Sequence, residues 1–185
     1  MVNTFDGLLG LLVDNQVRFT LVGGLAVSLN GFVRTTEDMD ILVDDDPSNV
    51  QNLLNCLSQF GDGYARELSP LDFSDEEGAV RVREDFDLDI FVRMRGSKYQ
   101  DMVDHIRHHD LPDGTQVPYL DADGLILLKG SSIREKDRID VAALNRLARE
   151  GTQAADEVTN LSLDKLRASS PSPPDESPGK EAKSG

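Results

Sequence analysis

Asp38 and Asp40, separated by one apolar residue, have the spacing in this chain that most directly predicts chemistry. In a strand, residues two apart share a face, so the two carboxylates would stand side by side. Neighbouring carboxylates repel each other and need a cation, supplied by a basic side chain or by a metal. Mg²⁺ suits such a pair, because it takes a few carboxylate oxygens and keeps its other positions for water and substrate phosphate.

A second acidic pair lies in the segment Phe86–Val92, where Asp87 and Asp89 alternate with Leu88 and Ile90. This alternation predicts a strand with both carboxylates on one face and apolar side chains on the other. A site that holds two metal ions around a phosphate needs a third carboxylate beside the first two. The sequence predicts that this segment supplies it and leaves open whether Asp87 or Asp89 does so.

Arg34 and Thr36 continue the alternation of Asp38 and Asp40 toward the N-terminus. The pattern predicts a strand that carries a cation, a hydroxyl and two carboxylates on one face. Arg34 is a candidate cation for neutralising the two acids. The alternative is a plain ion pair with Glu37 or Asp38.

Gly23 and Gly24 follow the apolar run Phe19–Val22, and thirteen residues separate Gly24 from Asp38. This gap accommodates a short helix over residues 25–30 and a turn at Gly31 before the acidic strand. Glycines where a strand turns into a helix present backbone N–H groups that can cradle phosphate oxygens. The alternative is a tight turn that binds no ligand.

The glycine pair, the Asp38–Ile41 motif and the later Leu88–Ile90 motif together resemble the signature of the polymerase-beta-like nucleotidyltransferase superfamily. Within it, the run GGLAVSLNGFVRTTEDMDILV is similar to small bacterial proteins related to abortive-infection and toxin–antitoxin nucleotidyltransferases. The resemblance covers residues 18–149. A later L-L-K, which ends at Lys129, looks like the start of the closing helices of the same proteins.

This resemblance implies transfer of a nucleoside monophosphate from a nucleoside triphosphate (NTP) to a hydroxyl group, with pyrophosphate released. The implied cofactor is Mg²⁺, or alternatively Mn²⁺. The residues implied to hold the metals and perform catalysis are Asp38, Asp40 and Asp89, with Asp87 the rival for the third position. The residues implied to bind the nucleotide are Gly23, Gly24, Arg34, Thr36 and Lys129. A solvated lysine near a helix end is the alternative for Lys129.

The sequence leaves the acceptor open, because only about forty residues follow the catalytic core before the C-terminal tail. A protein, a tRNA or a small hydroxylated molecule are the alternatives, and a partner subunit or antitoxin protein could complete the site. A second hypothesis is a catalytically inactive module that keeps the nucleotidyltransferase fold and regulates a partner.

Composition narrows the class of protein further. The chain of 185 residues carries a formal charge of −15, of which residues 151–185 contribute −2 through six acids and four bases. Such an acidic body disfavours extended contact with DNA or RNA. We expect no membrane segment and no signal peptide. The single cysteine, Cys56, lies at helical spacing among leucines and is expected in the core, which fits a cytoplasmic protein.

The sequence predicts an α/β (α+β) domain over residues 1–150, with a mixed sheet flanked by helices and with helices at its C-terminal end. A C-terminal extension over residues 151–185 is expected to be disordered from about residue 168, where proline, serine and charge replace apolar residues. An acidic loop over residues 69–78 is expected to be solvated or to border the site. One helix is expected to begin after Thr4 and another near Pro47, and further helices are expected over residues 97–109 and 121–149. Strands are expected over residues 19–22, 34–43, 64–68, 79–83 and 86–92 and before Leu120.

Overall fold

The structure, a computed structural model, describes residues 4–33, 35, 36, 38–130 and 134–149. Backbone contacts divide the chain into two units, Met1–Ala148 and Arg149–Gly185. The strands and the labelled helices all belong to the first unit. The predicted extension over residues 151–185, including its predicted disorder, lies outside the described residues. Among the described helices, none has the length and apolar character that crossing a membrane requires.

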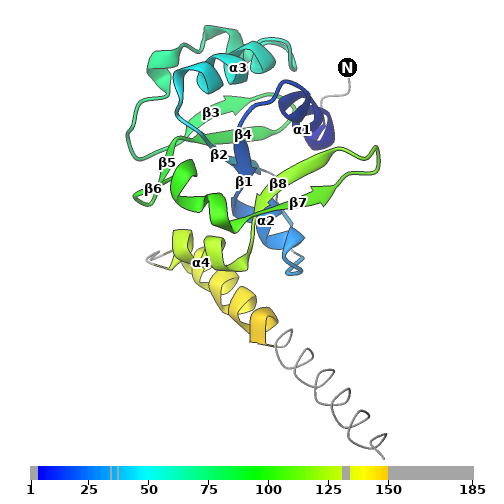
Figure 1. Cartoon of the computed structure of the whole chain (residues 1–185), viewed down its shortest axis with the longest axis vertical. Coiled ribbons are helices and arrows are strands. Elements are labelled where there is room, and N and C mark those ends of the chain that lie inside the picture. Colours follow the sequence, from blue (N-terminus) through cyan, green and yellow to red (C-terminus); the bar gives the residue numbers. More distant parts are fainter. Residues whose placement is uncertain (1–3, 34, 37, 131–133, 150–185) are drawn as a thin grey trace, which may run out of the picture. The chain divides into compact units, whose positions relative to one another are not determined.

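Within the described residues, the first unit is built on a six-stranded mixed sheet with the order β3-β4-β2-β1-β8-β7 (Figure 1). Strand β2 lies near its centre, antiparallel to β1 and parallel to β4, and β1 is parallel to β8. This confirms the mixed sheet that the sequence predicts. The strands are β1 (Phe19–Leu21), β2 (Asp38–Val43), β3 (Val80–Arg83), β4 (Asp87–Phe91), β7 (Ile106–Asp110) and β8 (Gln116–Leu120), with a separate hairpin of β5 (Arg93–Met94) and β6 (Ser97–Lys98).

Two groups of helices flank the strands. Helix α1 contacts α3 above the strands in Figure 1, and α2 contacts α4 below them. Residues 135–149 are also helical. The helices are α1 (Phe5–Asp14), α2 (Gly23–Leu29), α3 (Pro47–Leu57) and α4 (Ala122–Lys129), and the 3-10 helices are η1 (Tyr64–Glu67), η2 (Pro70–Asp72) and η3 (Tyr99–His105).

Side-chain caps fix where three of the helices begin. The Thr4 hydroxyl accepts a hydrogen bond from a first-turn N–H of α1, and the carboxylates of Asp46 and Asp121 do the same for α3 and α4. Each such cap contributes about 1 kcal/mol. The helix starts predicted after Thr4 and near residue 121 are thus confirmed.

The core lies between the sheet and these helices. On β2, Met39, Ile41 and Val43 are fully buried on one face, while Asp38 and Asp40 keep partial exposure on the other. Burial of each large apolar side chain stabilises the fold by about 1.5–3 kcal/mol. Cys56 is buried as predicted, and burial raises the pKa of its thiol to about 11. The apolar face of β2 therefore anchors the strand that presents its aspartates.

Two predicted elements are wrong. The segment 64–68 is not a strand: Tyr64–Glu67 form the 3-10 helix η1, because Gly63 enters with a left-handed backbone and Glu84 accepts the N–H groups of Asp62 and Tyr64. Residues 97–109 do not form one helix. They run through β6 and η3 into β7, where pairing with β8 replaces helical hydrogen bonds.

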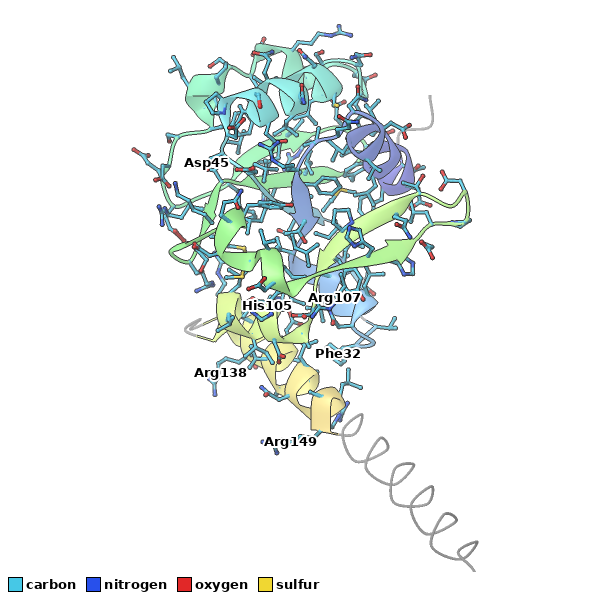
Figure 2. All side chains as sticks on the ribbon, viewed as in Figure 1. Phe32, Asp45, His105, Arg107, Arg138 and Arg149 are labelled. Carbon is cyan, nitrogen blue, oxygen red and sulfur yellow. The ribbon has the colours of Figure 1, made fainter. Side chains whose placement is uncertain are left out.

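The pairing of β7 with β8 also separates the three histidines that the predicted helix would have grouped. The Nδ1 atom of His105 lies 3.1 Å from the carboxylate of Asp121, and the Nη2 atom of Arg107 lies 2.7 Å from it. Figure 2 shows His105 and Arg107 near the beginning of α4. His108 and His109 lie further along β7, where they are exposed.

Candidate active site

The parallel pairing of β2 with β4 brings the two acidic pairs together. In this register, Asp38 lies opposite Asp87 and Asp40 lies opposite Asp89. Because side chains at equivalent positions of neighbouring strands point to the same face, all four acids belong to one side of the sheet. Each strand's other face is apolar and fixes that orientation.

A pocket of about 480 Å³ opens over this side of the sheet. It collects Asp38, Asp40 and Asp89 with the glycine pair and Lys129, whereas Asp87 does not line it. The residues that line the pocket are Gly23, Gly24, Asp38, Asp40, Glu77, Gly78, Arg81, Asp89, Phe91, Arg93, Met94, Arg95, Lys129, Arg134, Lys136 and Asp137. The volume is in the range of small-molecule sites.

Asp40 lies at the centre of this group. Burial raises the pKa of its carboxyl group, and the negative charges of Asp89 and Asp38 raise it further. A hydrogen bond from the backbone N–H of Gly24 and the charge of Lys129 act in the opposite direction. Asp89 and Asp38 are thus close enough to Asp40 to disfavour its ionisation, which is the condition under which a bound cation stabilises the site.

Asp89 is held by an arginine that sequence reasoning missed. The Nε and Nη2 atoms of Arg81 donate to the two carboxylate oxygens of Asp89 at 2.7 and 2.6 Å. Arg81 stands directly opposite Asp89 in the antiparallel pair of β3 and β4. The alternation of arginine and valine in Val80–Arg83 was the available signal, because cross-strand pairing of opposite charges is common in sheets.

Asp87 has its own arginine and does not line the pocket. The Nε and Nη2 atoms of Arg83 donate to its two oxygens at 2.8 and 3.3 Å, which lowers the pKa of Asp87. The geometry therefore places Asp89, and not Asp87, beside Asp40. Among the described residues, no three acidic, histidine or cysteine side chains lie close enough together to form a ready-made metal site.

The glycine pair opens α2 as the sequence predicts, although the helix begins at Gly23 and not near residue 25. The Val22 N–H donates to the carbonyl of Asp40 at 2.9 Å, which ties the turn to β2. Gly23 has a left-handed backbone with φ of 61°, and a Cβ atom there would lie 1.9 Å from Oδ2 of Asp40. Glycine is therefore required for Asp40 to sit against the turn.

We predict that Gly23→Ala lowers the melting temperature by about 5 °C or more, since the left-handed backbone alone costs roughly 1–2 kcal/mol. The new methyl group must also displace the Asp40 carboxylate. Gly10→Ala is the matched control, because Gly10 lies in α1 with no other group within 4 Å of its added Cβ. Alanine favours a helix by about 1 kcal/mol over glycine, so this control should melt at or above the wild-type temperature. Equal melting of the two variants would contradict the assigned contact.

The structure does not bring Thr36 into the pocket lining. Strand β2 begins at Asp38, so Thr36 precedes it and does not share the strand face, contrary to the prediction. Its hydroxyl donates to the backbone carbonyl of Asp38 at 3.1 Å, which fixes the entry into the strand. Arg34 lies outside the described residues, so its predicted role stays a prediction.

Lys129 is buried, with 4 % of its surface exposed, so the interpretation of a solvated lysine is wrong. Its ammonium group pairs with the buried carboxylate of Asp140 and lies 3.7 Å from that of Asp137. Helical residues 135–149 supply both acids. The C-terminal part of the unit thereby holds Lys129 at the pocket beside Asp40.

Basic side chains are concentrated around the pocket. Six of the lining residues are basic and five are acidic, although the whole chain carries a charge of −15. Sequence reasoning missed most of them because they come from separate segments: Arg81, Arg93, Arg95, Arg134 and Lys136. Glu77 and Gly78 show that the acidic loop borders the pocket. A nearly balanced pocket in an acidic protein suits an anionic ligand accompanied by a cation.

Comparison with solved structures identifies the fold class. The lincosamide antibiotic adenylyltransferase LnuA, with lincomycin bound, superposes with a TM-score of 0.53 at 17 % identity, covering 77 % of this chain and 94 % of that one. A Thermotoga maritima protein provisionally named a nucleotidyltransferase gives a TM-score of 0.47 at 16 % identity, covering 84 % of this chain and 89 % of that one. No protein-family model and no curated protein matches the sequence. The chain has the nucleotidyltransferase fold, as its resemblance to the polymerase-beta-like superfamily predicts.

Proposed function

We propose that this protein is a metal-dependent nucleotidyltransferase that moves a nucleoside monophosphate from a nucleoside triphosphate, ATP in the first instance, to a hydroxyl group. The convergence of Asp38, Asp40 and Asp89 with the glycine turn at one pocket carries this proposal. The fold alone would not, because one fold hosts many activities. The site adds carboxylates, a glycine turn and basic side chains around one pocket.

The donor chemistry of the site fits Mg²⁺, or Mn²⁺ in its place. Asp38, Asp40 and Asp89 offer the carboxylate oxygens that these ions take. The raised pKa of Asp40 reflects burial and then the neighbouring negative charges, which a cation would offset. Such an ion would supply charge stabilisation at the reacting phosphate and the leaving pyrophosphate. We assign no metal to Asp87, which Arg83 engages outside the pocket.

The chain's own groups would bind and orient the substrates. The Gly23 turn and the buried ammonium of Lys129 face the position proposed for the triphosphate, where N–H dipoles and a fixed cation favour phosphate oxygens. The carboxylate of Asp89, once free of Arg81, would accept the proton of the attacking hydroxyl or help to hold the metal. Attack on the α-phosphorus then forms the new phosphodiester bond and breaks the bond to pyrophosphate.

The acceptor is the open part of this proposal. The similarity in fold to a lincosamide adenylyltransferase favours a small hydroxylated molecule as the first class to test. A protein or a tRNA end are the other acceptors, and a toxin–antitoxin or abortive-infection role would add an antitoxin partner. The acidic body makes long nucleic-acid contact unfavourable, so a tRNA would have to enter by its end.

We predict that ATP with Mg²⁺ raises the melting temperature by about 5–10 °C at a hundred times the dissociation constant, because the ligand binds only the folded state. Asp38→Asn and Asp40→Asn should each lose most of this shift. Asp87→Asn is the matched control on the same side of the sheet and should keep it. If Asp87→Asn loses the shift, the third carboxylate has been assigned to the wrong residue.

A further inference from the structure

Arg81 occupies the carboxylate that the proposed function requires for a metal or for a proton. Its guanidinium group contacts both oxygens of Asp89 in a two-pronged arrangement, at 2.7 and 2.6 Å. Guanidinium and carboxylate groups match each other in this geometry, so the pair is among the stronger polar contacts in proteins. While the pair is formed, Asp89 has its oxygens directed at Arg81.

The two partners differ in how they are buried. The side chain of Asp89 is 11 % exposed, whereas that of Arg81 is 53 % exposed. A largely buried carboxylate beside Asp40 needs a counter-cation at all times, because an unpaired buried charge is costly. The arginine, in contrast, reaches solvent and can leave without losing hydration. Replacing Arg81 by another cation at Asp89 therefore costs less free energy than leaving the Asp89 carboxylate without a cation.

A second carboxylate, already paired with Arg83, lies next to Arg81. The Nη1 atom of Arg81 lies 3.7 Å from Oδ2 of Asp87, which does not line the pocket. Asp87 precedes Asp89 by two positions on β4, so both face the guanidinium from the same side of the sheet. A small rotation of the arginine side chain would exchange one carboxylate for the other while β3 and β4 stay paired.

We propose that Arg81 is a positioning residue that neutralises Asp89 in the metal-free protein and gives way, toward Asp87, when a divalent cation enters the site. This inference rests on the proposed function. It adds that Arg81 sets the affinity of the site for the metal. Apparent metal affinity is then the intrinsic affinity multiplied by the fraction of molecules in which Asp89 is released. Arg81 also lines the pocket, so its charge stays near the bound phosphates after release.

The neighbouring pair of Arg83 with Asp87 supplies a matched control. Both arginines lie on β3, each contacts both oxygens of the aspartate directly opposite on β4, and each substitution to glutamine removes one positive charge. They differ in that Arg81 lines the pocket and Arg83 does not. Any effect of general charge on metal binding should therefore appear in both variants, and an effect of direct occupancy only in Arg81→Gln.

The test is titration of full-length protein with Mn²⁺ in the absence of nucleotide, followed by electron paramagnetic resonance of the free ion. We expect Arg81→Gln to bind Mn²⁺ about three- to tenfold more tightly than wild type, as release of a competing ion pair implies, and Arg83→Gln to change affinity less than about twofold. In EDTA, Arg81→Gln should melt below wild type, and Mn²⁺ should restore most of the difference. Arg81→Lys, which keeps the charge but loses the two-pronged contact, should also bind Mn²⁺ more tightly than wild type.

Each other outcome is decisive. If wild type binds Mn²⁺ and both Arg81 variants bind it equally or more weakly, the exchange is wrong while the proposed metal site stands. If Arg81→Gln and Arg83→Gln tighten binding alike, a general charge effect replaces the exchange. If wild type and all variants fail to bind Mn²⁺, the proposed metal site fails and the exchange fails with it.

Discussion

Replacing Asp40 by asparagine is expected to lower the rate of nucleotidyl transfer by about a thousandfold or more. A neutral amide cannot hold a divalent cation, yet it has the shape of the carboxylate and can still accept the Gly24 N–H. The substitution also removes a carboxyl group whose ionisation the folded protein disfavours, as the raised pKa of Asp40 shows. Metal-free Asp40→Asn should therefore melt above wild type at neutral pH while losing activity.

The pH dependence of this stability difference follows from the direction of the shift. A raised pKa means that the folded protein holds its proton to a higher pH than the unfolded chain does, so stability falls as pH rises between the two values. Wild type should thus lose stability relative to Asp40→Asn as pH rises from the ordinary range of an aspartate toward neutrality. Melting curves in EDTA measure this difference, and the opposite slope would contradict the assigned burial and repulsion.

Asp87→Asn is the control for the loss of activity. It removes one carboxylate from the same side of the sheet but from outside the pocket. The rate should fall less than about tenfold, since no interaction made only in the transition state is lost. A loss as large as that of Asp40→Asn would show that Asp87, and not Asp89, is the third carboxylate of the site.

Replacing Lys129 by methionine is expected to destabilise the protein by about 3–5 kcal/mol, because it leaves the carboxylate of Asp140 charged and without its ammonium partner in the interior. For a domain of this size the melting temperature should fall by about 10 °C. Asp140 has 1 % of its side chain exposed, so water cannot take the place of Lys129. Differential scanning calorimetry measures the loss.

The double variant Lys129→Met with Asp140→Leu separates stability from binding. Replacing both partners of a buried pair with apolar side chains often restores stability, so the double variant should melt well above the single one. The affinity of the double variant for ATP then measures how much the Lys129 ammonium contributes to nucleotide binding. Restored stability with wild-type affinity would remove Lys129 from the proposed nucleotide site.

The alternation of polar and apolar residues was sufficient to predict the strands that carry Asp38, Asp40 and Asp89. The period of two places one side chain per face, and the apolar half of each strand had to enter the core. It did not distinguish Asp89 from Asp87, because both share a face. The register of β2 with β4 and the position of the pocket favour Asp89, and neither is visible in one segment alone.

Long-range pairing also accounts for the predictions that were wrong. The apolar residues before and at Ile106, namely Tyr99, Met102 and Val103, have the spacing of a helix, but the turn at Pro112–Gly114 lets residues 106–110 pair with residues 116–120 as a hairpin. Pairing across strands overrides local preference in such cases. Arg81 and Asp140 were missed for the same reason, since each was recognisable only from a partner on another element.

Nucleotidyl transfer itself is best tested with ATP labelled at the α- or the γ-phosphate, with Mg²⁺ or Mn²⁺ and a panel of hydroxylated small molecules, tRNA and the protein itself. We predict that the α-label moves to an acceptor, that pyrophosphate appears, and that Asp89→Asn removes transfer while largely sparing nucleotide binding. Transfer of the γ-label would identify a phosphotransferase and contradict the proposed function. Failure of the α-label to move with either metal, in protein that still binds ATP, would favour the inactive binding module.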